Sequence, residues 1–76
     1  MNQARRKKIE AVKMQLEALS DDIDNILSDE QDYYDNIPEN LQGSERASIA
    51  EDAISALENA VDSLSEAISS LEEAAG

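Results

Sequence analysis

The stretch from Tyr33 to Arg46 reads YYDNIPENLQGSER, and it decides the fold because the helical pattern of the chain breaks only there. It contains both tyrosines, the single proline and the one basic residue that follows Lys13. Pro38 lacks a backbone donor and pushes the preceding residue out of the helical region, so a helix has to end here. Ser44 is a favourable N-cap for a second helix, and Glu45 suits the first turn of that helix. We therefore interpret the stretch as the turn of a helical hairpin.

Before the turn, apolar residues recur at alternating steps of three and four, which is the a/d pattern of a coiled coil. Glu30 is the one charged residue in this pattern. Neither Gly nor Pro falls between Asn2 and Asn36, so the sequence predicts one helix over about residues 2–36. The predicted seam of this helix consists of Ile9, Val12, Leu16, Leu19, Ile23, Ile26, Glu30, Tyr33 and Ile37.

The same alternation resumes after a turn at about residues 37–44 and predicts a second helix over about residues 45–75. When the chain folds back, the two seams match in an antiparallel register that sets Ile9 opposite Ala75 and Ile37 opposite Ala47. The sequence therefore predicts an all-α fold, in which residues 1–76 form a single antiparallel two-helix coiled-coil hairpin. The predicted seam of the second helix consists of Ala47, Ala50, Ile54, Leu57, Val61, Leu64, Ile68, Leu71 and Ala75.

A second apolar stripe predicts that the hairpin associates with itself. Leu27 and Tyr34 lie beside the seam of the first helix. A chain of 76 residues without Phe, Trp or Cys buries only a small core as a monomer. We expect a homo-oligomer built as a helical bundle, and the alternative is a loosely packed monomer whose alanines merely favour helix. The alanines beside the second seam recur at every seventh residue, at Ala53, Ala60, Ala67 and Ala74.

The composition narrows the classes of function. The chain has 18 acidic and 6 basic residues and a net charge of −12, which repels nucleic acids and anionic membranes. No apolar run reaches the roughly 20 residues of a membrane span, and no secretory signal follows the basic start, so we expect a cytoplasmic protein. Because the chain has no His and no Cys, it lacks the usual general bases, nucleophiles and zinc ligands. We expect no enzymatic activity, no metal and no cofactor.

Arg46 is the first candidate for a functional role. It is the only cation among residues 14–76, and it lies in the first turn of a helix, where the helix dipole disfavours a positive charge. An ion pair with Glu30 would compensate for this position and lock the turn. The alternative is a bound anion, held by the guanidinium, the Ser44 hydroxyl and the helix N-terminal amides.

Aromatic and amide side chains of the same stretch are suited to a nucleobase. Tyr33 and Tyr34 offer flat faces for stacking, and the amides offer hydrogen bonds to a base edge. Tyr33 belongs to the predicted seam and is expected in the core, whereas Tyr34 lies beside the seam and is the better candidate for a ligand or an interface. The predicted ligand-binding residues are Tyr33, Tyr34, Asn36, Asn40, Gln42, Ser44 and Arg46.

The turn combines Tyr34, Asn36, Pro38-Glu39, Leu41-Gln42 and Ser44-Glu45-Arg46 ahead of an Ala/Ile/Leu/Glu repeat over residues 53–74. In this pattern the sequence resembles a group of short acidic hairpins from bacteriophage genomes. That group is similar to viral "sponge" proteins, which form helical oligomers and sequester the nucleotide signals of bacterial antiviral defence. The resemblance implies a counter-defence protein of the host cytoplasm that holds a cyclic dinucleotide or a cyclic ADP-ribose derivative between subunits without cleaving it. It would place Tyr34, Asn36, Ser44 and Arg46 near that ligand.

Two other functions are compatible with the sequence. An acidic protein-interaction module could imitate the phosphate spacing of DNA and occupy the basic cleft of a host protein such as a CRISPR nuclease. Such an interaction should be lost at several hundred millimolar salt, because it depends on charge attraction. A structural coiled-coil part of a virion, or an assembly chaperone, would show self-association and nothing else.

Overall fold

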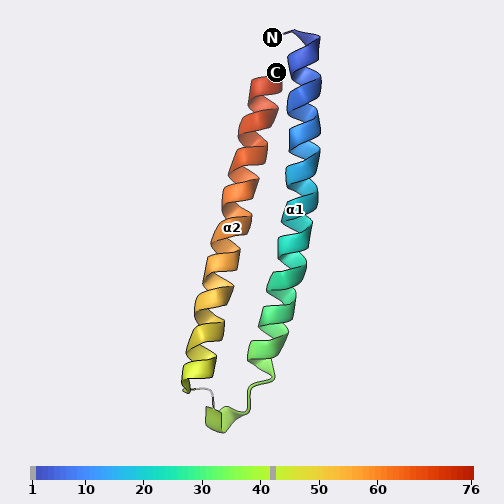
Figure 1. Ribbon diagram of the computed structural model, residues 1–76. Coiled ribbons are helices and arrows are strands. Elements are labelled where there is room, and N and C mark those ends of the chain that lie inside the picture. Colours follow the sequence, from blue (N-terminus) through green and yellow to red (C-terminus); the bar gives the residue numbers. More distant parts are fainter. Residues whose placement is uncertain (1, 42) are drawn as a thin grey trace.

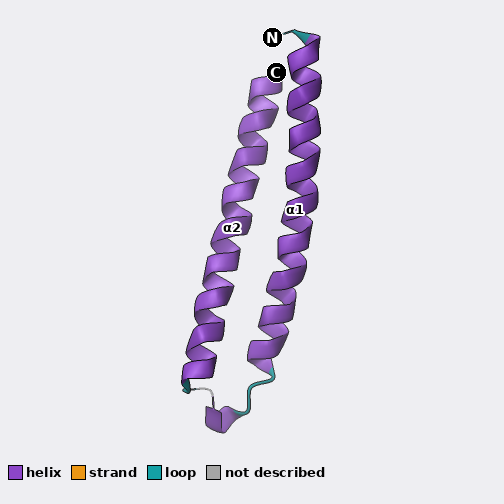
Figure 2. Ribbon diagram, in the orientation of Figure 1, coloured by secondary structure: helices purple, strands orange, loops and turns teal. Residues whose placement is uncertain are grey.

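The computed structural model describes residues 2–41 and 43–76 and confirms the two-helix hairpin (Figures 1 and 2). Two long helices, α1 (Gln3–Asp35) and α2 (Glu45–Ala75), run antiparallel, and a short 3₁₀ helix, η1 (Glu39–Leu41), lies in the connection. Both ends of the chain lie at one end of the hairpin (Figure 1). The molecule measures 60 × 14 × 12 Å, and its radius of gyration of 17.4 Å compares with about 11 Å for a compact domain of this length.

Polar side chains cap the first turn of each long helix. The Asn2 side chain accepts a hydrogen bond from the backbone N–H of Arg5 at 2.9 Å. The Ser44 hydroxyl accepts one from the backbone N–H of Ala47 at 3.4 Å. These bonds satisfy amides that have no partner within the helix, so each cap fixes where its helix begins. α1 ends shortly before Pro38, in agreement with the helix-breaking role of that residue.

Two side-chain contacts confirm the antiparallel register. Near the ends of the chain, Lys13 Nζ lies 3.1 Å from Glu72 Oε1. Near the turn, the Tyr34 hydroxyl donates a hydrogen bond to Glu51 Oε1 at 2.5 Å. Both contacts belong to the register that pairs the start of α1 with the end of α2, so the two helices are matched along their whole length.

The face that α1 turns toward α2 differs from the predicted seam. Val12, Leu19, Ile26 and Tyr33 were expected in the seam, but they are 46, 52, 54 and 46% exposed. The prediction was therefore wrong at every second seam position. At those positions α1 packs the following residue instead, which corresponds to a rotation of roughly 50°, half the angle between successive helical residues. The half-buried residues of α1 are Ile9, Lys13, Leu16, Ser20, Ile23, Leu27, Glu30 and Tyr34.

The side chains that the rotation brings to α2 explain why it is tolerated. Leu27 supplies aliphatic surface, and Tyr34 supplies both a ring and a hydrogen bond. Lys13 lays its aliphatic stem along the neighbouring helix and carries its ammonium to Glu72 at the edge. Ser20 is small enough to pack without displacing the backbone of α2. Lys13 and Ser20 are polar, so a pattern of apolar residues alone favours the predicted seam over the observed rotation of α1.

The most tightly packed part of the hairpin lies beside the turn. Ile37 is 6% exposed, and Ala47 and Ala50 are each 1% exposed. The two alanines allow the chain that leaves α1 to approach the first turns of α2 closely. Farther along, α2 keeps its predicted seam half-buried and adds Ala53, Ala60 and Ala67 beside it.

Enlarging a buried alanine should destabilise the hairpin. We expect Ala47→Leu to lower the free energy of unfolding by about 1–3 kcal/mol, because Ala47 is 1% exposed and its surroundings leave no space for the added carbons. Ala18→Leu adds the same atoms to the exposed surface of α1 and should change stability by less than about 0.5 kcal/mol. Thermal unfolding followed by circular dichroism measures both. Equal stability of the two variants would contradict the packing described here.

Candidate functional site at the turn

A hollow of about 320 Å³ lies where the two helices meet beside the turn. We call it the turn hollow. The Ser44 cap starts α2 at Glu45, so Arg46 and Ile49 fall within its first turns and reach the hollow from one side. The rotation of α1 brings Tyr33 to it from the other side. Its lining residues are Glu30, Tyr33, Glu45, Arg46, Ile49 and Ala50.

Arg46 is exposed in the turn hollow and shares it with two carboxylates. Glu30 is half-buried between the helices, and Glu45 is exposed beside Arg46 in the first turn of α2. Over residues 2–41 and 43–76, no ion pair joins Arg46 to Glu30 or to another carboxylate. The guanidinium therefore keeps its donors available, and the unpaired amides of the helix N-terminus add positive potential near it.

The two tyrosines have exchanged the positions that were expected for them. Tyr33 is 46% exposed and lines the turn hollow beside Arg46. Tyr34 is half-buried on the other side of the helix contact, and its hydroxyl donates to Glu51. Successive helical residues point about 100° apart, so the rotation of α1 that exposes the first necessarily packs the second. Tyr33, not Tyr34, is the aromatic side chain that a ligand in the hollow would contact.

The other predicted site residues have structural partners or lie elsewhere. The Ser44 hydroxyl caps α2, and the Asn36 side-chain amide donates to the Asp32 carbonyl at 2.8 Å at the end of α1. Asn40 is exposed within η1 and does not line the turn hollow. Gln42 lies outside the described residues. Of the predicted set, the described structure thus brings only Arg46 and Tyr33 together.

Sequence reasoning missed part of the hollow wall. Ile49 is 62% exposed and forms its apolar side. The signal was present in the sequence, since Ile49 is an aliphatic residue that falls outside the three-four alternation of α2. Glu45 was assigned to the start of α2 only, and its place beside Arg46 follows from the helical geometry of the first turn.

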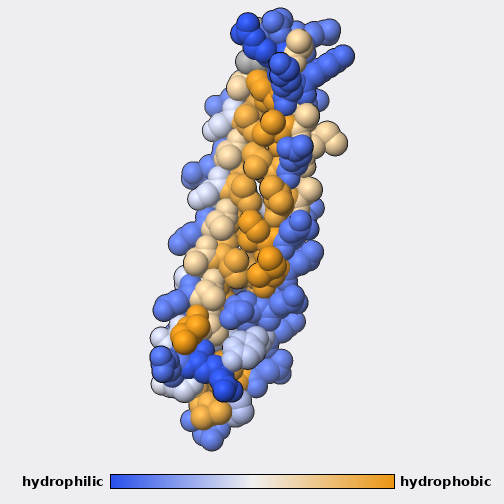
Figure 3. All heavy atoms as spheres, viewed as in Figure 1, coloured by the Kyte–Doolittle hydropathy of each residue, from blue (hydrophilic) through white to orange (hydrophobic). Residues whose placement is uncertain are grey.

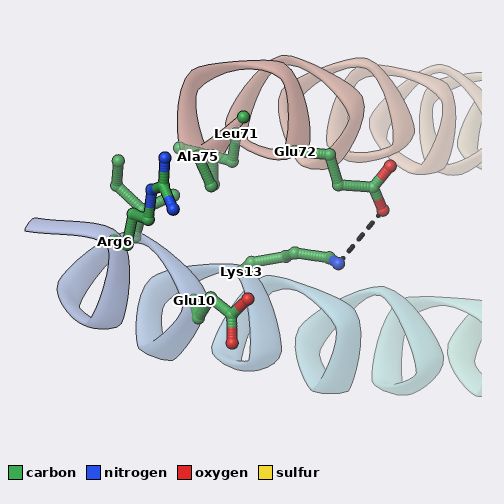
Figure 4. A pocket seen from close by; sticks show the side chains of 8 residues that line it. Arg6, Glu10, Lys13, Leu71, Glu72 and Ala75 are labelled. Atoms are coloured by element: carbon green, nitrogen blue, oxygen red, sulfur yellow. Dashed lines mark ion pairs between the residues drawn. The ribbon is translucent and has the colours of Figure 1, made fainter. Parts of the chain in front are cut away.

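A second hollow of about 330 Å³ lies at the opposite end of the hairpin. Figure 4 shows Lys13 and Glu72 reaching toward each other across it, while Arg6 extends toward the last turn of α2. The hydrogen bond to Glu72 is the main cause that raises the pKa of Lys13 above its ordinary value. A guanidinium beside the end of a helix is stabilised by the negative end of the helix dipole. Lys13 therefore has its partner, Glu72, within the chain.

Two features of the described residues bear on the class of site. No three acidic side chains there lie close enough together to hold a metal ion. Neither long helix has an apolar stretch of the length that crossing a membrane requires, again within the described ranges.

The Tyr34–Glu51 contact has a pH signature. Hydrogen bonding to Glu51, then burial, raises the pKa of the Tyr34 phenol above its ordinary value of about 10. The contact therefore stabilises the hairpin fully below that ordinary value, and its contribution is lost as the pH rises through the raised pKa.

In the Tyr33→Phe variant Tyr34 is the only phenol, because the chain has two tyrosines and no Trp. Its absorbance at alkaline pH should titrate above the ordinary midpoint, and adding Glu51→Gln should move the midpoint back toward it. An unchanged midpoint would show that Glu51 does not hold the phenol.

Comparisons with protein-family models, with curated proteins and with solved structures found no match to this chain.

Proposed function

We propose that this protein binds a small anionic ligand that carries a nucleobase, and that it acts by holding this ligand rather than by converting it. The observation that carries the proposal is the turn hollow, where Arg46 and Tyr33 are both exposed and adjacent. A cation and an aromatic face side by side are the two elements that bind a phosphate and a base of one nucleotide.

The chemistry of the hollow is consistent with such a ligand. Arg46 has five N–H donors and no competing ion pair within the described part of the chain, so it can bind phosphate oxygens in bidentate fashion. Tyr33 offers its ring to a base, and Ile49 provides an apolar wall against which the base or a sugar can pack.

The carboxylates of the turn hollow restrict which anionic ligands can bind there. Glu30 and Glu45 repel phosphate, and so does the net charge of −12. The same carboxylates accept hydrogen bonds, for which ribose hydroxyls and exocyclic amino groups are the donors of a nucleotide. A ligand with dispersed charge, such as a cyclic nucleotide, meets this restriction better than a linear triphosphate does.

Sequestration is the mode of action that follows from the residues available. The chain contains no His and no Cys, and the side chains of the turn hollow include no nucleophile next to a general base. The resemblance to phage hairpins related to nucleotide sponges gives this binding a role. On that basis the ligand is a cyclic dinucleotide or a cyclic ADP-ribose derivative that signals antiviral defence, and the protein removes it from the host cytoplasm.

A second candidate function is an acidic protein-interaction module. It is favoured by the exposure of every Asp and Glu in the chain except Glu30, which leaves rows of carboxylates along both helices. These rows could occupy the basic cleft of a host protein that ordinarily binds DNA. Binding of this kind would depend strongly on salt and not on Tyr33.

Thermal unfolding with a panel of cyclic dinucleotides and cyclic ADP-ribose isomers tests the first proposal. A ligand at 100 times its dissociation constant stabilises a protein by about 2.7 kcal/mol, which corresponds to roughly 10–20 °C for a domain of this size. We expect such a shift with one class of compound. Arg46→Gln should abolish the shift while leaving the helical circular dichroism unchanged, because the guanidinium makes no ion pair in the described structure.

Glu45→Gln is the matched control, since it changes a charge at the neighbouring residue of the same helical turn. It removes a repulsive carboxylate from the hollow, so it should leave the shift intact or enlarge it. No shift with any compound of the panel would reject the nucleotide proposal and favour the acidic interaction module. Unfolding of Arg46→Gln without ligand would show that Arg46 has a structural role instead.

A further inference from the structure

One face of the hairpin is apolar and uncovered. Val12, Leu19, Ile26 and Tyr33 lie seven residues apart on α1, and each is about half exposed. We call them the heptad row. Figure 3 shows an apolar stripe that runs along the contact between the helices for most of their length, with charged side chains on either side. Isolated exposed apolar residues are common, but a continuous row of this length marks an interaction surface.

Alanines of α2 border the heptad row. Arg46 lines the turn hollow together with Tyr33, so this side of α2 lies on the same face as the row. The residues that follow Arg46 at steps of seven share its side of the helix. They form what we call the alanine row, which consists of Ala53, Ala60, Ala67 and Ala74. This face thus carries large, half-exposed side chains from α1 next to small side chains from α2, of which Ala53, Ala60 and Ala67 are half-buried and Ala74 is exposed.

The surface area of the chain indicates how much of this face a partner would cover. The hairpin exposes 5580 Å², whereas a compact protein of 8.3 kDa exposes roughly 4,600 Å². The difference of roughly 1,000 Å² is close to the ~800 Å² that each partner buries in an interface of standard size.

We propose that a second copy of this chain covers the heptad row and that the two hairpins are antiparallel, related by a two-fold axis perpendicular to their length. Charge decides the orientation. The basic segment Arg5–Lys8 and Lys13 lie at the open end of the hairpin, while the turn end is acidic. Parallel hairpins would place like charges side by side at both ends, and antiparallel hairpins place the basic end of each over the acidic end of the other. The acidic residues near the turn are Asp29, Glu30, Asp32, Asp35, Glu39, Glu45, Glu51 and Asp52.

The spacing of the two rows agrees with that orientation. A two-fold axis perpendicular to the length sets α1 of one copy over α1 of the other in the opposite direction, so a step of seven toward the turn on one heptad row matches a step of seven away from the turn on the other. With the axis level with the middle of the heptad row, Leu19 lies over Ile26 of the second copy, and Ile26 lies over its Leu19. The same axis sets Val12 over Tyr33 of the second copy, and it sets the alanine row over the alanine row of the second copy. Such an interface is self-complementary, as a two-fold dimer requires.

The dimer also completes the turn hollow. With Tyr33 over Val12 of the second copy, the basic segment of that copy lies level with Arg46. Its cations offset the charge of Glu45 and add positive potential beside the hollow, where a single hairpin has only one guanidinium. Tyr33 then lies at the boundary between the copies. The dimer itself rests on the uncovered face and the charge layout, and it does not depend on the ligand proposal.

The oligomeric state and the distance between two labels test the proposal. Light scattering should give twice the 8.3 kDa of one chain. Leu19→Asp places an unpaired charge in the interface twice and should weaken the dimer by about 100-fold or more. Met14→Asp is the matched control, because Met14 is 68% exposed on α1 but lies outside the heptad row. It should leave the dimer intact.

The orientation is measured on a chain that is changed only outside the interface. The result therefore does not depend on whether an interface variant folds. The protein has no Cys, and Gln3→Cys therefore accepts a single spin label per copy at an exposed position. At a rise of 1.5 Å per residue, the two labels should be about 55 Å apart in the antiparallel dimer and within about 30 Å in a parallel one. A monomer at about 100 µM, or the short distance, would overturn the proposal. An antiparallel dimer without a thermal shift from any nucleotide would support this inference and reject the ligand proposal.

Discussion

A helix with a single neighbour can bury only one stripe of its surface, and this constraint governs the whole hairpin. α1 carries more apolar surface than α2 can cover, since Leu27 and Tyr34 adjoin a seam that already contains Ile26 and Tyr33. Packing the first pair against α2 leaves the second pair exposed. The exposed row, the position of Tyr33 in the turn hollow and the hydrogen bond of Tyr34 all follow from that one rotation.

The sequence was sufficient for the architecture because local signals and long-range pattern agree. Pro38 ends one helix, Ser44 starts the next, and two seams of equal length fix the antiparallel register. The rotation of α1 was not accessible in the same way. The apolar pattern favours Val12 and Leu19 in the contact, whereas the structure packs Lys13 and Ser20 there. The long aliphatic stem of Lys13 and the small side chain of Ser20 fit between helices at little energetic cost. A hydrophobicity scale ranks both residues as polar and so does not predict this packing.

The candidate site, like the fold, could be predicted from the sequence only in part. Arg46 stands out in the sequence because no other cation follows Lys13, and its place at the start of α2 follows from the Ser44 cap. Adjacent residues of a helix point about 100° apart, so a rotation of α1 by roughly 50° decides which tyrosine accompanies Arg46. The sequence predicted the Ser44 cap, but it did not reveal the hydrogen bond of Asn36 at the end of α1, since an amide suits a helix end and a ligand equally well.

The concentration of buried side chains beside the turn has a consequence for the order in which the chain folds. Ile37, Ala47 and Ala50 are close in sequence, so bringing them together closes a short loop and costs less conformational entropy than joining the two ends of the chain. Each further step of the seam then adds contacts next to those already formed. Assembly is therefore cheapest when it begins in the middle of the chain and proceeds outward, and the open end with its basic segment closes last. During synthesis, α1 has no partner until the first turns of α2 have left the ribosome.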